Sequence, residues 1–303
     1  MLALCLPWGL LLALITACVL LGLRKWRWTL LFLLIVFLIN GCFHVFPVNL
    51  YRDNSENNGF KVLSWNIDGS SPSIRNHIRA IGKAILKEDA DIVYLAEDYY
   101  YCRGTLDSLL KTAYPFSTYS IYDECHYFYS KYPLGEHKRI AYDSTSMSYI
   151  VQSSVKIDGR IVDLFGCHLS SNNYSQQTAE RVDKIEGFCS LLSYFRSISE
   201  ASEIRAKETK AIIDSLNSSR PTIVMGDLND VCGAKALDIL ENGGMIDAWS
   251  EGGFGYGATI YTPLPYRIDH VFYNDYLQLN RVYLVTANDL SDHDALTCVF
   301  NIE

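Results

Sequence analysis

The chain has 303 residues, 49% of them hydrophobic and 20% charged, and a formal net charge of −8. This length allows one large domain or two small ones, and the composition excludes a disordered polymer. Residues 1–50 contain three basic side chains and no acidic one. Of the 26 Lys and Arg residues, 23 therefore lie beyond residue 50, together with all 34 acidic residues. This acidic balance excludes nucleic-acid binding through bulk positive charge.

The N-terminal 50 residues contain two apolar runs, 2–23 and 28–48, the second interrupted by Asn40 and His44. About 20 helical residues cross the ~30 Å hydrocarbon core of a bilayer, so each run is long enough to span one. The turn over residues 24–28 combines three basic side chains with two tryptophans, a pattern typical of the cytoplasmic membrane surface. We therefore predict a two-helix transmembrane anchor over residues 1–50 of a multi-pass protein in the plasma or bacterial inner membrane, with everything that follows on the extracytoplasmic side.

Two other interpretations of this segment compete with the anchor. A signal peptide would carry a basic n-region and a shorter apolar run than residues 2–23. Lipid attachment at Cys42 is the other alternative, and the neighbouring Asn40 disfavours it. Residues 51–60 are polar and without periodicity, which predicts a linker to one domain over residues 61–303.

Nine cysteines divide into three in the predicted anchor and six beyond it, with no CxxC or Cys/His cluster that would indicate structural zinc. If the domain lies outside the cytoplasm, Cys102 and Cys125 are a candidate disulfide, since both lie in polar, tyrosine-rich stretches. Cys167 and Cys298 lie within apolar strand patterns, which predicts buried thiols. The pairing among Cys102, Cys125, Cys167, Cys189, Cys232 and Cys298 stays open.

The first half of the domain alternates strand and helix patterns. Residues 61–68 alternate in polarity, which predicts a strand, and Ile74, Ile78, Ile81 and Ile85 recur at helical spacing. Residues 91–97 form a buried-type strand that ends on an acid. Residues 146–157 and 160–168 flank Asp158-Gly159, which predicts a hairpin.

The second half continues with a long helical stretch and three strands. Residues 174–217 are largely helical, and the part over 174–206 is either a substrate lid or an extra packed helix. Strands are predicted over 222–226, 267–273 and 295–302. Strands and helices mixed with hairpins indicate an α+β domain of packed sheets with helices outside.

Polar side chains interrupt the apolar strands at their ends. Buried strand ends disfavour such groups unless they are paired or bind an ion. Any one acid at a strand end is more often a turn residue, but the whole set is hard to explain as turns. The set comprises Asn66, Asp68, Glu97, His168, Asp227, Asn229, Asp269, Asp292 and His293.

These motifs resemble, in order along residues 61–300, those of the endonuclease/exonuclease/phosphatase superfamily, which includes deoxyribonuclease I, abasic-site endonucleases, neutral sphingomyelinases and inositol polyphosphate phosphatases. The resemblance implies a deoxyribonuclease I-like, four-layer α/β/β/α sandwich. The matching stretches are Ser64-Trp65-Asn66-Ile67-Asp68-Gly69, Glu97, His168-Leu169, Gly226-Asp227-Leu228-Asn229-Asp230, Arg267-Ile268-Asp269-His270-Val271-Phe272 and Ser291-Asp292-His293.

The resemblance and the residue chemistry agree on a metal site. Glu97, Asn66 and Asp292, with Asp68 nearby, offer the hard oxygen ligands that Mg²⁺ or Mn²⁺ prefers. Such an ion neutralises charge on the scissile phosphate and on the leaving oxygen. The expected cofactor is therefore Mg²⁺, with Mn²⁺ as the alternative.

The resemblance also implies catalytic roles for the remaining residues. His293 is expected to activate the attacking water, with Asp269 fixing its tautomer. Asp227 and Asn229 are expected to orient the water and the phosphate. His168 is expected to donate to a phosphate oxygen or to the leaving group.

Other polar and aromatic residues are expected to be structural. Alternation places His270 on the opposite sheet face from Asp269, which predicts a buried, hydrogen-bonded histidine. His126 and His137 are expected at the surface. The tyrosines of residues 99–101 and of residues 127–132 are interpreted as exposed hairpin residues, although they could also stack bases or meet lipid headgroups.

The resulting hypothesis is a membrane-tethered, metal-dependent phosphoester hydrolase, most directly a nuclease or another phosphodiesterase. The alternatives are a phospholipid hydrolase of sphingomyelinase type, an inositol-phosphate phosphatase, and a non-catalytic phosphoester-binding or sensor module on the same fold. The expected partners are a phosphoester substrate and the lipid bilayer, contacted through residues 2–23 and 28–48. No obligate protein partner is inferred.

Overall fold

The computed structural model describes residues 2–49, 59–69, 71–98, 100–118, 126–140, 148–172, 188–261 and 264–303. Most of the predicted linker lies outside these ranges, as do Cys125, Tyr99 and the first part of the predicted lid. Cys102 is buried, with its Sγ 3.7 Å from the carbonyl oxygen of Gly69, and its pairing with Cys125 stays a prediction.

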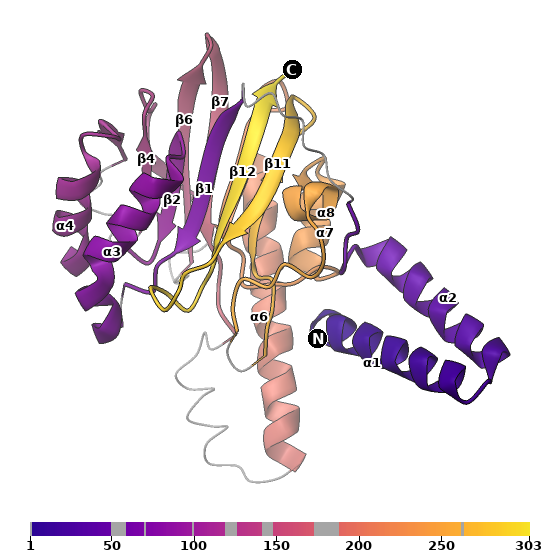
Figure 1. The fold of residues 1–303 in the computed structure, drawn as a ribbon. Helices are drawn as coiled ribbons and strands as arrows, with labels where there is room; N and C mark the ends of the chain where they lie inside the picture. The colour runs from indigo at the N-terminus through magenta and orange to yellow at the C-terminus, as the bar shows by residue number, and fades with distance from the viewer. Residues whose placement is uncertain are drawn as a thin grey trace.

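Two apolar helices, α1 (Leu2–Gly22) and α2 (Trp26–Phe43), begin the chain and form an antiparallel hairpin that extends away from the rest of the molecule (Figure 1). The second helix ends earlier than residue 48, where the apolar run ends. His44 adopts a left-handed conformation (φ 47°) and its backbone N–H donates to the carbonyl of Asn40, which closes the last turn. Asn40 also exchanges two hydrogen bonds with the backbone of Phe46, so the interruption in the apolar run marks the helix end.

The first sheet has the strand order β11-β12-β1-β2-β4-β3, with β1 and β2 parallel and the other neighbouring pairs antiparallel. Its strands are β1 (Phe60–Asn66), β2 (Ile92–Ala96), β3 (Phe116–Ser117), β4 (His126–Ser130), β11 (Leu277–Val285) and β12 (Ala295–Ile302). Two helices, α3 (Pro72–Glu88) and α4 (Tyr100–Leu110), cover its outer face. The alternation of β1 explains this packing, because Leu63 and Trp65 meet Ile81 and Leu106 on the helical side while Val62 faces the other sheet.

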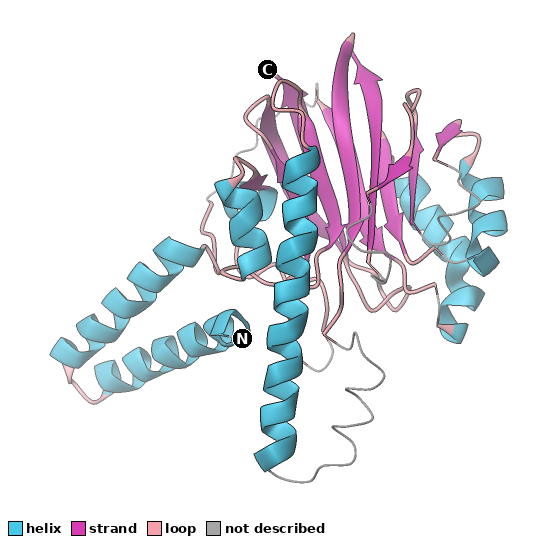
Figure 2. Ribbon diagram, turned by 180° about the vertical axis from the view of Figure 1, so that it is seen from behind, coloured by secondary structure: helices cyan, strands magenta, loops and turns pink. Residues whose placement is uncertain are grey.

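The second sheet has the order β5-β6-β7-β8-β10-β9, with β7 and β8 parallel. Its strands are β5 (Lys138–Arg139), β6 (Tyr149–Ile157), β7 (Arg160–His168), β8 (Thr222–Asp227), β9 (Ile246–Asp247) and β10 (Asp269–Tyr273). The outer face is covered by α6 (Phe188–Ser215) and α7 (Lys235–Asn242), while the short α8 (Ala248–Gly252) follows β9 (Figure 2). The predicted hairpin is confirmed, since β6 and β7 turn through Asp158 (φ 50°) and Gly159 (φ 83°).

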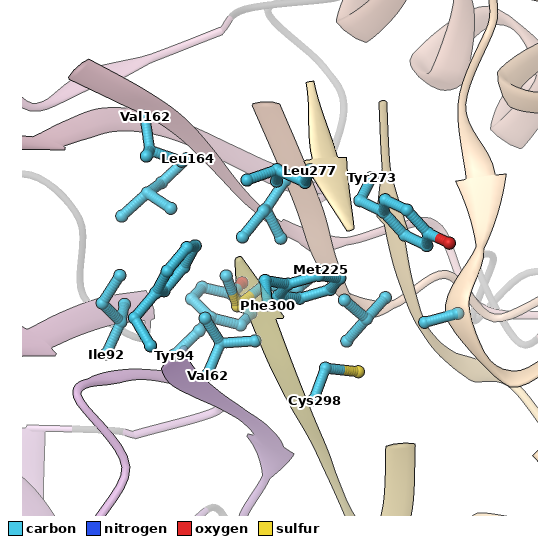
Figure 3. Close-up of a cluster of buried hydrophobic side chains, with 14 of the residues drawn as sticks. Val62, Ile92, Tyr94, Val162, Leu164, Met225, Tyr273, Leu277, Cys298 and Phe300 are labelled. Atoms are coloured by element: carbon cyan, nitrogen blue, oxygen red, sulfur yellow. The ribbon is translucent and has the colours of Figure 1, made fainter. Parts of the chain in front are cut away.

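The main core lies between the inner faces of the two sheets (Figure 3). Val62, Tyr94 and Phe300 from the first sheet meet Leu164 and Met225 from the second, all fully buried. Cys167 and Cys298 are buried as predicted. Two mixed sheets packed face to face and flanked by helices confirm the predicted α/β/β/α sandwich.

Candidate active site

The polar residues predicted at strand ends meet at one edge of the sandwich. Because β1 and β2 are parallel and in register, Asn66 and the residue after Ala96, Glu97, reach the same edge. In the second sheet His168 pairs with Asp227 at the ends of β7 and β8, and Asp269 begins β10 directly opposite Asp227. The polar side chains at the strand ends of both sheets therefore lie together at one edge of the sandwich.

Local backbone geometry turns these residues out of the sheets. Asp68, Glu97 and Asn229 all have a positive φ, between 44° and 58°. Non-glycine residues adopt this left-handed conformation at an energetic cost, and such strain concentrates at functional sites. Gly226 has φ 140°, and a Cβ there would lie 1.9 Å from the carbonyl oxygen of Cys167. Only glycine therefore allows β8 to approach β7 just before Asp227.

A buried histidine–aspartate pair forms one side of the site. The Nδ1 atom of His293 lies 2.7 Å from Oδ2 of Asp269. Its Nε2 atom lies 3.9 Å from Oδ2 of Asp227 and 4.0 Å from Oδ1 of Asp292. Burial alone would lower the pKa of His293, but the carboxylates of Asp269 and Asp227 outweigh it and raise that pKa to about 10. Burial likewise opposes ionisation of Asp269, and the facing imidazole nevertheless holds its pKa below the ordinary value.

Asn66 links the two sheets across the site. Its Nδ2 donates to Oε1 of Glu97 and to Oδ2 of Asp227, each at 3.1 Å. The Nε2 atom of His168 lies 3.5 Å from the same Glu97 oxygen and 3.7 Å from the same Asp227 oxygen. Two imidazoles, His168 at the end of β7 and His293 just before β12, therefore lie near one buried carboxylate.

The site carries excess negative charge. Burial, followed by the neighbouring carboxylate of Asp269, raises the pKa of Asp227 above its ordinary value. Within the described ranges, no lysine or arginine forms an ion pair with Glu97, Asp227 or Asp269; only histidines do. Oxygen-rich, uncompensated carboxylates are the donor set that suits a hard divalent cation. The residues present therefore fit such an ion.

The structure places the predicted metal ligands in two groups. Glu97 and Asn66 are in direct contact, whereas Asp292 stands on the His293 side with 44% of its side chain exposed. The backbone N–H of Asp68 donates to Oδ1 of Asn66, so Asp68 lies beside this pair. Among the described residues, Asp227, Asp269 and His293 also have the spacing of metal ligands, since their ligand atoms all lie within 4.8 Å of one another.

Asn229 contacts the neighbouring loop. Its Nδ2 donates to the carbonyl of Leu169 at 2.9 Å, and its backbone N–H donates to Oδ1 of Asp227 at 2.8 Å. The residue thus ties the loop after β8 to the loop after β7. Its expected contact with water and phosphate stays a prediction.

Three residues that support the pair were not assigned such a role from the sequence. The Oγ1 atom of Thr259 accepts from the backbone N–H of Asp269 at 3.1 Å. Ser291 donates to the carbonyl of Asn66 and accepts from the backbone N–H of His293, while the indole of Trp65 donates to the carbonyl of His293. Ser291 and Trp65 stand inside the motifs, but no pattern in the sequence connects Thr259 to Asp269.

The expectation of a surface position for His126 is wrong. His126 begins β4, is 1% exposed, and stacks on Tyr149 with ring centroids 4.5 Å apart. Its ring also lies 5.5 Å from that of His168, and burial holds its pKa well below the ordinary value. A strand assignment for residues 126–130 would have placed this side chain between the sheets. His137 is partly buried rather than exposed.

The tyrosines after His126 also differ from the expected exposed hairpin residues. Tyr127 and Tyr129 are each 2% exposed and pack with the core on the helical side of the first sheet. They are therefore structural and do not offer a stacking surface. His270 is buried as predicted, with Nδ1 3.0 Å from Nη1 of Arg267 and Nε2 3.1 Å from the carbonyl oxygen of Asp230.

Comparisons with known proteins place the fold and the family. No curated protein matches the sequence. Among solved structures, the fold is similar to that of D. rerio TDP2 humanized by 14 mutations, with a TM-score of 0.61 and 18% identity over 80% of this chain and 98% of that one. It is similar to an endonuclease/exonuclease/phosphatase from Beutenbergia cavernae DSM 12333, with a TM-score of 0.59 and 16% identity over 80% of this chain and 71% of that one.

A third similar structure is beta toxin 275-280 from Staphylococcus aureus, with a TM-score of 0.56 and 18% identity over 79% of this chain and 99% of that one. At these identities the likeness shows the fold alone. The family model described as "Endonuclease/Exonuclease/phosphatase family" matches residues 63–293, which include every strand-end residue of the site. The chain belongs to the endonuclease/exonuclease/phosphatase family.

Proposed function

We propose that this chain is a membrane-tethered, divalent-metal-dependent phosphoester hydrolase, a nuclease or another phosphodiesterase. The single observation that carries the proposal is the buried His293–Asp269 pair, which faces the contacting side chains of Asn66, Glu97 and Asp227. A similar structure, that of D. rerio TDP2, contains a single strand DNA product, which supports a phosphodiester substrate.

The histidine–aspartate pair acts as the general base. Asp269 accepts the Nδ1 proton of His293, which leaves Nε2 to take a proton from the attacking water. Nε2 is on the side of Asp227, whose carboxylate orients that water. His168, whose Nε2 lies 3.7 Å from the same Asp227 oxygen, donates to a non-bridging or leaving oxygen of the phosphate. The reaction is an in-line hydrolysis without a covalent enzyme intermediate.

Glu97 and Asn66, with Asp68 beside them and Asp292 on the His293 side, would hold the divalent ion. When bound, Mg²⁺ or Mn²⁺ neutralises the charge that develops on the phosphate. The excess negative charge of the site supports this assignment, because phosphate would otherwise meet several uncompensated carboxylates.

The N-terminal hairpin tethers the enzyme to a membrane. Residues 3–22 and 26–43 are long and apolar enough to cross one, and only 17% and 6% of them are buried, unlike the core helices of a soluble domain. The three basic side chains at the hairpin tip support a cytoplasmic tip and an extracytoplasmic catalytic domain.

Substitutions in the full-length chain test the catalytic assignment. We expect His293→Ala and Glu97→Gln each to lower the turnover of bis(p-nitrophenyl) phosphate by roughly 10²-fold or more. His77→Ala, an exposed histidine of α3, is the control and should retain full turnover. Substantial activity in a folded His293→Ala protein would show that another group is the base.

A further inference from the structure

Three exposed apolar side chains lie on the segment between α8 and β10. Phe254 is 66% exposed, Tyr261 54% and Leu264 44%. Large apolar side chains gathered on one segment beside a functional site indicate a contact surface. We call these three residues the apolar loop.

The apolar loop is continuous with the base of the helical hairpin. Phe254 forms a β-bridge with Val48, itself 66% exposed, and the backbone N–H of Gly255 donates to the carbonyl of Pro47 at 2.9 Å. The side chain of Asn49 donates to the carbonyls of Ser250 and Gly253, at 3.1 and 3.0 Å. The end of the hairpin and the start of the apolar loop are therefore held together by backbone and side-chain hydrogen bonds.

The hairpin also contacts the loops that carry the catalytic residues. Ala3 packs on Val231 and Ala234, which follow the Asp227–Asp230 motif in the chain. The indole Nε1 of Trp8 donates to the hydroxyl of Tyr266 at 3.2 Å, and their rings meet edge to face. These contacts fix the first turns of α1 against the edge of the sandwich that holds the site.

Ile260, the residue before Tyr261 of the apolar loop, pairs with the catalytic segment. It forms β-bridges with His293 and with Tyr266, the residue that Trp8 of the hairpin contacts. The hydroxyl of Tyr261 donates to Oδ2 of Asp294, the residue after His293. The membrane-spanning hairpin, the apolar loop and the active site thus occupy adjoining parts of one surface.

A helix that spans a bilayer ends at the headgroup layer, and apolar side chains next to that end enter the same layer. We infer that the apolar loop inserts into the surface of the bilayer that the hairpin spans, and that the active site hydrolyses a phosphoester carried by a membrane lipid. This inference rests on the proposed function. Lipid headgroups place their phosphates at the level to which the hairpin base and the apolar loop bring the catalytic edge.

The test compares a lipid substrate with a soluble one, using the full-length chain reconstituted with Mg²⁺ in vesicles of phosphatidylcholine, phosphatidylglycerol and sphingomyelin in equal parts. Release of headgroup phosphoesters measures lipid hydrolysis, and bis(p-nitrophenyl) phosphate measures hydrolysis in solution. The double variant Phe254→Gln/Leu264→Gln removes apolar contact from two side chains that fill no core. Ile161→Gln is the matched control, since Ile161 is 41% exposed but lies at the far end of β7 from His168.

We expect wild type and Ile161→Gln to hydrolyse both substrates, and the double variant to lose roughly tenfold or more of its lipid hydrolysis while its soluble turnover is unchanged. Soluble turnover without lipid hydrolysis in wild type would overturn the lipid substrate and leave the hydrolase assignment standing. Failure on both substrates would overturn both. Three results would each show that the apolar loop does not insert into the bilayer. They are an equal loss of activity on both substrates, normal lipid hydrolysis by the double variant, and a wild-type dimer that becomes a monomer in the double variant.

Discussion

At the scale of single residues, the protonation of His293 decides whether the site can work. A general base must be neutral to accept a proton, yet the surrounding carboxylates raise the pKa of this imidazole to about 10 when no cation offsets them. The site therefore favours an imidazolium in the metal-free protein and needs added positive charge to release the proton. This coupling would be a physical reason for the proposed metal dependence that is separate from activation of the phosphate.

Proton NMR titration of His293 in the full-length protein tests this electrostatic coupling. In the presence of EDTA we expect its ring to titrate near pH 10, and we expect Asp269→Asn, or added Mg²⁺, to lower that pKa. The exposed His77, which can be followed in the same spectra, should not respond to either change. A His293 ring that titrates at its ordinary pKa in EDTA would contradict the coupling.

The same pKa shifts predict how the stability of the metal-free protein depends on pH. The raised pKa of His293 contributes stability that is complete below the unfolded value of about 6.5 and is lost as the pH rises through about 10. The lowered pKa of Asp269 contributes stability above the unfolded value of about 3.9 that is lost as the pH falls through its folded value. The free energies of unfolding of wild type and Asp269→Asn, measured with urea, should therefore differ most between about pH 3.9 and pH 6.5. The two values should converge as the pH rises through about 10.

At the scale of elements, α6 joins the two loops that follow His168 and Asp227. The buried guanidinium of Arg205 on this helix donates to Asp230 at 3.0 Å, to the carbonyl of Ser170 at 2.9 Å and to Oδ1 of Asn172 at 3.0 Å. Glu208, one turn later, accepts from the backbone N–H and hydroxyl of Ser170. The helix thus acts as a clamp on the loops after β7 and β8.

Replacement of the clamp residue should separate stability from positioning. We expect Arg205→Met to destabilise the protein by about 3–5 kcal/mol, because it leaves Asp230 charged and buried without a partner. Arg205→Met/Asp230→Asn should recover part of that stability but not kcat, since the loops stay unclamped. Lys210→Met, in the exposed pair with Asp214 on the same helix, is the control and should change stability by less than about 1 kcal/mol. Recovery of kcat in the double variant would show that the clamp stabilises the fold but does not position the loops for catalysis.

The elements that were predicted from the sequence had strong local signals, and those that were missed lacked them. The turn signal at Asp158-Gly159 predicted the hairpin of β6 and β7. The apolar run of β2, which ends on an acid, predicted that Glu97 belongs to the site. The strand β4 was missed because His126–Ser130 is polar and aromatic in sequence. It becomes buried only when the second sheet covers one of its faces and α3 and α4 cover the other. The same absence of a local signal hid Thr259 and Arg205, whose contacts lie 10 and 25 residues away in the chain.

At the scale of the whole molecule, the proposed membrane tether rests on the N-terminal hairpin. We expect the full-length chain to remain in the membrane fraction after carbonate extraction, and residues 59–303 alone to be released. Among the described residues, the helices long and apolar enough to cross a membrane are the two of the hairpin. Terminal sequencing of the membrane-bound protein should find residues 1–50 intact. A mature chain that begins after residue 23 would support a cleaved signal sequence instead of a two-helix anchor.

The central claim, that this site is a metal-dependent phosphodiesterase, is tested most directly by one assay. The turnover of bis(p-nitrophenyl) phosphate by the purified full-length chain is measured in detergent micelles, first with EDTA and then with excess Mg²⁺. We predict turnover that requires Mg²⁺, is abolished by EDTA, and is lost in His293→Ala. Turnover that persists undiminished in EDTA, or no turnover from a folded protein saturated with Mg²⁺ or Mn²⁺, would contradict the claim.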